Sequence, residues 1–147
     1  MSASSRRRSR PDAALTRVAR AALAEDLGKG DATSRALVPA SSRGHAFLVA
    51  KEPGVVAGLG VAAAVFQAAS SKCRVRLLVR DGARVPAFTK VARIEGPLRA
   101  ILAGERTALN FLQRLSGIAT LTRAFVVKAR PYRVVILDTR KTTPLLR

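Results

Sequence analysis

The hydrophobic residues change their spacing along the chain, and two stretches have the spacing of helices. Apolar positions recur three and four residues apart over residues 13–27, between Asp12, a suitable N-cap, and Gly28, a suitable stop. We therefore expect an amphipathic helix at 13–27. Residues 58–69 are rich in Ala and Val and predict a buried helix, with Phe66 as its large anchor.

Three other stretches favour strands. Apolar side chains fill most of residues 43–51, alternate with arginines over 73–79, and alternate weakly over 90–94. Turn-forming pairs follow these stretches at Pro53–Gly54, Asp81–Gly82 and Gly96–Pro97. Residues 27–34, with their glycines and hydroxyls, are expected to form a loop. Helices mixed with a short sheet predict an α+β fold in which the helices pack on the sheet.

The last third of the chain predicts more helix and then one strand. From Leu98 to Leu115, apolar residues recur at helical spacing, and we expect a break at residues 116–117 before a second helix over 120–130. Residues 133–138 contain four consecutive apolar side chains, the pattern of a strand buried on both faces in a parallel sheet or barrel.

Composition sets the class of protein. The chain has 147 residues, of which 48% are hydrophobic and 24% charged, which is typical of one globular unit. Because no apolar run approaches the roughly 20 residues that span a bilayer, we expect a soluble protein. We expect its location to be the cytoplasm, whose reducing conditions suit the single cysteine. Residues 1–11 are rich in Ser and Arg and predict a disordered basic tail. A single cysteine, Cys73, and a single histidine, His45, exclude an internal disulfide and disfavour a zinc site.

The net charge of +18 has three candidate causes: nucleic-acid binding, a cleft for small polyanions, and arginine-rich codon usage. The arginines are scattered along the chain, and only 4% of its residues are aromatic. A platform that stacks single-stranded bases needs aromatic side chains among its basic ones. A small basic nucleic-acid-binding module therefore remains an alternative that the pattern disfavours, and no specific nucleic-acid partner is expected.

A polar cluster directly follows the predicted strand: Asp138, Thr139, Arg140 and Lys141. Barrel enzymes place their sites at the carboxyl ends of their strands. Two adjacent cations at such a place need an anionic partner, and a dicarboxylate or a phosphate fits that requirement.

Several blocks of the sequence together resemble the quinolinate phosphoribosyltransferase family, also called nicotinate-nucleotide pyrophosphorylase (carboxylating). The longest are ERTALNFLQRLSGIAT at residues 105–120 and DTRKTTPLLR at 138–147. Shorter blocks, AEDLGKGDATS, KEPGVVAGLGVAAAVF and DGARV, follow the family's amino-terminal domain in order. The resemblance runs from about Ala13 to the last residue.

The resemblance implies a fold and an activity. Residues 12–97 would form an amino-terminal α/β sandwich, and 98–147 a helical segment and the first strand of an incomplete α/β barrel. The enzyme would convert quinolinate and 5-phosphoribosyl 1-pyrophosphate into nicotinate mononucleotide, pyrophosphate and CO2 in de novo NAD biosynthesis, with Mg²⁺. It would work as a homodimer with shared active sites. Because most of the barrel is missing, we expect this chain alone to be inactive and its lone strand to expose apolar surface.

The same resemblance implies the substrate-binding residues. Arg106 would reach into the neighbouring subunit's site, while Thr139, Arg140 and Lys141 would bind substrate from the first barrel strand. No residue of this chain is expected to act as a catalytic base or as a metal ligand.

Two positions depart from the family pattern, and one paralogue stays open. Leu145 stands where the family usually has glycine, and Phe88 lies in a turn that usually contains glycine. The family's paralogue associated with molybdate uptake, which has a different substrate, is the alternative within the same family.

Overall fold

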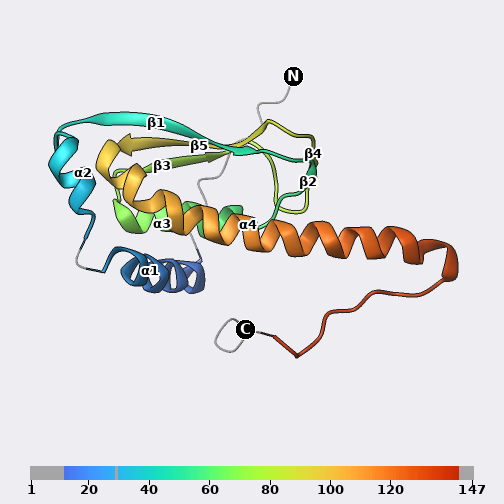
Figure 1. The fold of residues 1–147 in the computed structure, drawn as a ribbon. Coiled ribbons are helices and arrows are strands. Elements are labelled where there is room, and N and C mark those ends of the chain that lie inside the picture. Colours follow the sequence, from blue (N-terminus) through green and yellow to red (C-terminus); the bar gives the residue numbers. More distant parts are fainter. Residues whose placement is uncertain (1–11, 29, 143–147) are drawn as a thin grey trace, which may run out of the picture.

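The computed structural model describes residues 12–28 and 30–142 and has helices packed on one face of a sheet (Figure 1). The main sheet is antiparallel with the strand order β1-β5-β3, and β2 pairs with β4 in a two-stranded ribbon. This arrangement confirms the predicted α+β layer. The predicted tail at 1–11 and the departure at Leu145 lie outside the described residues. The elements are α1 (Ala13–Leu27), α2 (Ala32–Leu37), β1 (Arg43–Ala50), β2 (Gly54–Val55), α3 (Leu59–Ala69), β3 (Arg74–Leu77), β4 (Arg84–Val85), β5 (Thr89–Pro97), α4 (Leu98–Ala129) and the 3-10 turn η1 (Arg130–Tyr132).

The predicted first helix is confirmed together with both of its ends. The Asp12 carboxylate accepts a hydrogen bond from the Ala14 amide at 2.9 Å and so caps the amino end of α1. Gly28 ends the helix at a φ of 47°, and its amide donates to the Ala24 carbonyl at 3.0 Å.

The short helix α2 occupies part of the stretch that we expected to be a loop, so that expectation is wrong from Ala32 onward. Its first turn is capped by Asp31, whose carboxylate accepts from the Ser34 amide at 2.9 Å. Its last turn is tied to α4, because the Arg99 guanidinium donates to the carbonyls of Val38 at 2.7 Å and Arg35 at 2.9 Å. A helix of six residues is too short to show a periodic pattern and depends on such contacts.

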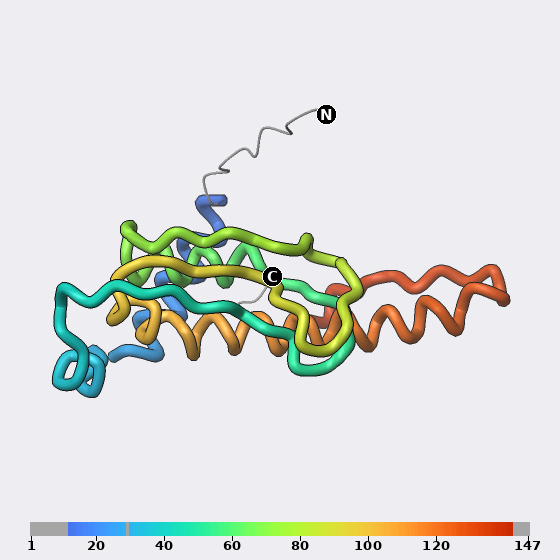
Figure 2. Tube along the Cα trace, turned by 90° about the horizontal axis from the view of Figure 1, so that it is seen from above, coloured from blue at the N-terminus to red at the C-terminus, as the bar shows by residue number. Residues whose placement is uncertain are grey.

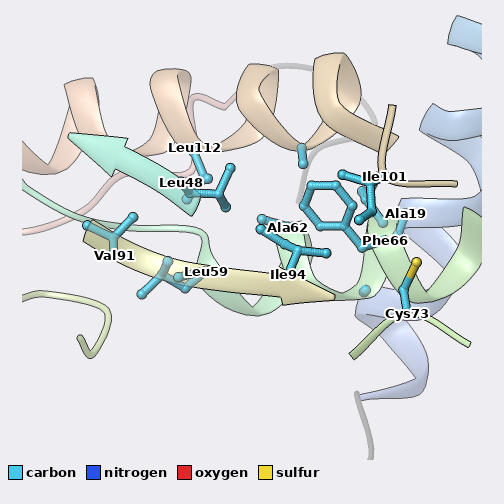
Figure 3. Packing of buried hydrophobic residues seen from close by; sticks show 14 of the residues in the cluster. Ala19, Leu48, Leu59, Ala62, Phe66, Cys73, Val91, Ile94, Ile101 and Leu112 are labelled. Atoms are coloured by element: carbon cyan, nitrogen blue, oxygen red, sulfur yellow. The ribbon is translucent and has the colours of Figure 1, made fainter. Parts of the chain in front are cut away.

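The core lies between the sheet and α3, and its largest fully buried side chains are Phe66, Leu59, Ile94 and Val65. Figure 3 shows the first three of these together. The expected anchor role of Phe66 is confirmed by its 1% exposure. Gly104 of α4 faces this ring, and a Cβ placed on Gly104 would lie 2.9 Å from Phe66 Cδ1. A glycine at this position therefore lets α3 and α4 approach closely.

Strand β5 is longer than the predicted 90–94. The chain stays extended through Gly96 and Pro97, which were expected to close the strand, because Gly96 pairs with Gly44 and Pro97 pairs with Arg43 of β1. Pairing with a neighbouring strand thus overrides the turn preference of this dipeptide.

Helix α4 is continuous through Ser116 and Gly117, so the predicted break there is wrong. The Ser116 hydroxyl accepts from the Ala57 amide at 3.0 Å and donates to the Ala57 carbonyl at 3.2 Å. One turn later, the Thr120 hydroxyl accepts from the Val55 amide at 2.9 Å. These contacts hold the helix against the segment around β2 across a position where glycine alone would weaken it.

The strand predicted at 133–138 is not formed. After η1 the chain turns back and runs in the opposite direction to α4, as both views show (Figures 1 and 2). Residues 134–139 have no regular structure, and the side chains of Val135 and Leu137 are 77% and 79% exposed. A strand needs a neighbour for its backbone hydrogen bonds, and the described residues offer none here. The expected exposure of apolar surface is confirmed.

The turn between β4 and β5 shows the consequence of the departure at Phe88. Phe88 has a φ of 61°, in the left-handed region that favours glycine, and its ring is 74% exposed. Its amide nevertheless donates to the Ala50 carbonyl, at 2.6 Å. The turn is therefore joined to β1 although a strained non-glycine residue stands at this position.

Among the helices formed by residues 12–28 and 30–142, none is both long and apolar enough to cross a bilayer.

Candidate functional site

The end of α1 meets the first half of α4 at a carboxylate shared by two side chains. Arg106 Nη1 lies 3.1 Å from Asp26 Oδ1, and the Thr107 hydroxyl donates to Asp26 Oδ2 at 3.1 Å. Thr107 is 3% exposed, whereas the Arg106 side chain is 76% exposed. The buried Thr107 thus holds one oxygen of Asp26, and the other oxygen pairs with the exposed guanidinium of Arg106.

The guanidinium of Arg106 has one edge in use and one edge open. Only its Nη1 atom bonds to another group within the described part of the chain. The Nε and Nη2 hydrogens form the planar fork that binds a carboxylate or phosphate through two parallel hydrogen bonds. The ion-pair partner of Arg106 within the described residues is Asp26.

Arg106 also acts on the loop before α2. The pKa of Asp31 is lowered from its usual value, first by its hydrogen bonds from Ser34, and further by the positive charges of Arg35 and Arg106. Partial burial opposes this effect. Arg106 therefore acts on two carboxylates of its own chain: it contacts Asp26 directly, and its charge lowers the pKa of Asp31.

The other three candidate residues lie in the exposed segment after η1. Thr139, Arg140 and Lys141 are all exposed, and the Lys141 amide donates to the Thr139 hydroxyl at 3.3 Å. The Thr142 amide donates to the Arg140 carbonyl at 3.1 Å. These local contacts curl the segment, and within residues 12–28 and 30–142 no hydrogen bond or ion pair joins it to Arg106. One chain alone does not assemble the four residues.

A separate apolar cleft of about 750 Å³ lies between α4 and the segment that joins β1 to β2. Its walls include Leu48 and Val56 on one side and Leu112, Thr120 and Leu121 of α4 on the other. None of the four predicted site residues lines this cleft. It therefore belongs to the packing of α4 rather than to the cationic site.

Family models match the chain over most of its length. Residues 31–116 match the model described as quinolinate phosphoribosyl transferase, N-terminal domain, and residues 118–147 match the corresponding C-terminal domain. The chain belongs to the quinolinate phosphoribosyl transferase family. This membership agrees with the sequence blocks and favours that interpretation over the nucleic-acid-binding module.

Curated relatives of the family cover the same part of the chain. It is 47% identical over 125 residues to the "Probable nicotinate-nucleotide pyrophosphorylase [carboxylating]" of Synechocystis sp.. The matched region covers 85% of this chain and 42% of the relative. It is 41% identical over 140 residues to the chloroplastic nicotinate-nucleotide pyrophosphorylase [carboxylating] of Arabidopsis thaliana, with 95% and 40% covered. The chain thus spans about 40% of the length of the curated relatives it matches.

Solved structures of the family share the fold. The nicotinate-nucleotide pyrophosphorylase of Francisella tularensis superposes with a TM-score of 0.84 at 36% identity, over 92% of this chain and 49% of that one. NadC from Streptococcus pyogenes superposes with a TM-score of 0.86 at 38% identity, over 90% of this chain and 47% of that one. The mixed helix and sheet fold is therefore that of the amino-terminal part of this family.

The sequence did not identify Asp26 or Thr107 as part of the site. Asp26 is 80 residues from Arg106 in the chain, and no local pattern links two positions so far apart. The signal that was present is indirect: Asp26 lies in the block AEDLGKGDATS, and both Arg106 and Thr107 lie in ERTALN. The contacts of Asp26 with Arg106 and Thr107 join these two blocks in space.

Proposed function

We propose that this chain is the amino-terminal portion of a quinolinate phosphoribosyltransferase of NAD biosynthesis. The complete enzyme joins quinolinate to 5-phosphoribosyl 1-pyrophosphate. The pyridine nitrogen attacks the ribose C1 carbon, and pyrophosphate leaves with the electrons of the broken C–O bond. The carboxylate at C2 then leaves as CO2, a proton takes its place, and nicotinate mononucleotide remains.

The observation that carries this proposal is the open fork of Arg106, on a chain that belongs to the family. A planar guanidinium grips a carboxylate of quinolinate through two hydrogen bonds, and Arg140 offers a second fork. Lys141 suits a compact contact to a carboxylate or phosphate, and Thr139 adds a hydroxyl. Holding both anions in line supplies the orientation that a weak nucleophile requires, and the attacking nitrogen needs no general base.

We propose further that the enzyme is a cytoplasmic homodimer in which Arg106 of one subunit enters the site of the other. The separation of Arg106 from the segment with Thr139, Arg140 and Lys141 supports a shared site, because one chain does not assemble all four residues.

Magnesium acts in the proposed reaction together with the pyrophosphate substrate. Within the described ranges, no three His, Cys, Asp or Glu side chains are grouped as a metal site, and Asp26 is engaged by Arg106 and Thr107. The residues present do not fit a magnesium site, so no step above uses the metal.

Activity measurements test the proposal directly. The purified 147-residue chain should make no nicotinate mononucleotide from the two substrates, whereas a version extended through a complete barrel should make it. Orientation of the two reactants can contribute roughly 7–11 kcal/mol, which is lost when the region that holds one of them is missing. Turnover by the 147-residue chain, or its absence in the extended protein, would contradict the proposal.

Mixing two inactive variants of the extended protein tests the shared site. Arg106→Ala and Arg140→Ala should each lose activity, and a mixture that exchanges subunits should regain part of it. In such a mixed dimer, one of the two sites collects both intact arginines. Arg123→Ala, at an exposed arginine of α4, serves as the control that should keep its activity. A mixture that stays inactive although the subunits exchange would argue against the shared site.

A further inference from the structure

Asp26 lies in the last turn of α1, which is an unfavourable place for a carboxylate. The helix dipole places partial negative charge at the carboxyl end of a helix and so disfavours an anion there. The last turn of α1 contains no basic side chain that would offset this effect. The position of Asp26 is explained by its contacts with α4 rather than by α1 itself.

Thr107 fixes the direction of this carboxylate. A threonine inside a helix often donates its hydroxyl to the carbonyl four residues earlier. Here the buried Thr107 donates to Asp26 Oδ2 instead, at 3.1 Å. The second oxygen, Oδ1, then lies 3.1 Å from Arg106 Nη1, on the solvent side.

We propose that Asp26 is a positioning residue, which holds one edge of the Arg106 guanidinium so that Nε and Nη2 face a carboxylate of the substrate. The inference rests on the proposed function, because it requires Arg106 to bind quinolinate. An exposed arginine otherwise samples many rotamers, and binding must order it. Asp26, itself oriented by Thr107, orders the side chain before the substrate arrives.

The alternative role of Asp26 predicts the opposite sign. A carboxylate 3.1 Å from Arg106 also repels an approaching anion, so a purely electrostatic role means that its removal strengthens quinolinate binding. Positioning means that its removal weakens binding, although a negative charge has gone. The direction of the change separates the two roles.

The test uses the version extended through a complete barrel, because one chain alone does not bring Arg106 together with Thr139, Arg140 and Lys141. Quinolinate is titrated into the ¹⁵N-labelled extended protein, and the Nε–H resonance of Arg106 is followed by NMR. Asp26→Ala should weaken binding at Arg106 by about threefold to tenfold, the cost of ordering one long side chain. Glu25→Ala is the matched control, because it removes the same charge from an exposed neighbour on α1. It should leave binding unchanged or strengthen it slightly.

Thr107 provides a second pair of variants in case Asp26→Ala disturbs the fold, which the amide spectrum and the melting temperature report. Thr107→Val removes the hydroxyl and should weaken binding, while Thr107→Ser keeps the hydroxyl and should restore it. A role of Thr107 in packing alone predicts the reverse order, because valine matches the shape of threonine more closely than serine does.

A double-mutant cycle, which follows total quinolinate binding through backbone amides, completes the test. In the Arg106→Ala background, Asp26→Ala should have no further effect. Tighter or unchanged binding by Asp26→Ala in the presence of Arg106 overturns the positioning role while leaving the proposed function intact. Unchanged binding by Arg106→Ala overturns both, because Arg106 is then not a quinolinate ligand.

Discussion

The hydroxyl of Ser116 bonds to both backbone polar groups of Ala57, accepting from its amide at 3.0 Å and donating to its carbonyl at 3.2 Å. Thr120, one helical turn later, accepts from the amide of Val55. Helix α4 thus provides hydrogen bonds that a neighbouring strand would otherwise give to Val55 of β2 and to Ala57 just after it. The close approach requires a small residue opposite, since a Cβ on Gly54 would lie 2.9 Å from Thr120 Oγ1.

Replacing Ser116 by alanine should lower the free energy of unfolding by about 1–2 kcal/mol, because two partly buried backbone groups lose their partner. Thr122→Ala removes a hydroxyl from an exposed position of the same helix and should leave stability unchanged or slightly higher. Urea unfolding followed by circular dichroism measures both variants. Equal stability of the two variants would show that the contact with Ala57 contributes nothing.

Replacing Phe88 by glycine should stabilise the chain. At a φ of 61°, a residue with a Cβ pays a steric cost of about 1–2 kcal/mol that glycine avoids. The greater freedom of glycine in the unfolded state offsets part of this gain. Phe88→Ala is the control, because it removes the same exposed ring and keeps the strain. In thermal unfolding the glycine variant should melt roughly 2–5 °C above the alanine variant. The reverse order would mean that the left-handed conformation is not strained.

Acid should weaken the cap of α2. The hydrogen bonds from Ser34 hold the pKa of Asp31 below its usual value of 3.8, so the folded state binds its proton less readily than the unfolded chain does. The resulting stability is fully present above pH 3.8 and is lost as the pH falls through the lower, folded-state pKa. Asp31→Asn keeps an N-cap without the charge, so its stability should fall less between pH 5 and pH 2. Parallel pH profiles for the two proteins would contradict this effect.

The single thiol should react slowly in the folded chain. Cys73 is 4% exposed, and burial raises the pKa of its thiol, against a smaller opposing effect of Arg43. The low exposure keeps reagents away from the sulfur, and the raised pKa lowers the fraction of reactive thiolate. At pH 8 a disulfide reagent should modify the folded chain at least tenfold more slowly than the chain in 6 M guanidinium chloride. Rapid modification without denaturant would place Cys73 at the surface.

The parts of the fold that the sequence predicts well are those with a strong local signal. The helix at 13–27 has apolar periodicity and the end residues Asp12 and Gly28, and the helix anchored by Phe66 has a run of Ala and Val; both form as expected. The four apolar residues within 133–138 have an equally clear pattern, but a strand depends on a neighbour, and the pattern cannot supply one.

The errors in the helical parts have a common physical cause. Helix α2 is too short for periodicity, and it relies on Arg99 from a distant part of the chain. Gly117 lacks intrinsic helix preference, yet the contact of Ser116 with Ala57 keeps α4 intact. In both places a contact distant in sequence outweighs local preference, as it also does where Arg106 meets Asp26.

The continuity of α4 has a mechanical consequence. The match to the N-terminal domain model ends at residue 116 and the match to the C-terminal domain model begins at residue 118, so the border between the two domains lies inside a single 32-residue helix. An α-helix turns by about 100° and rises by about 1.5 Å for each residue. The number of residues after the Ser116 anchor therefore sets the angular phase at which the following chain departs. One added residue would swing that departure by more than a right angle, whereas a change of seven would nearly restore it.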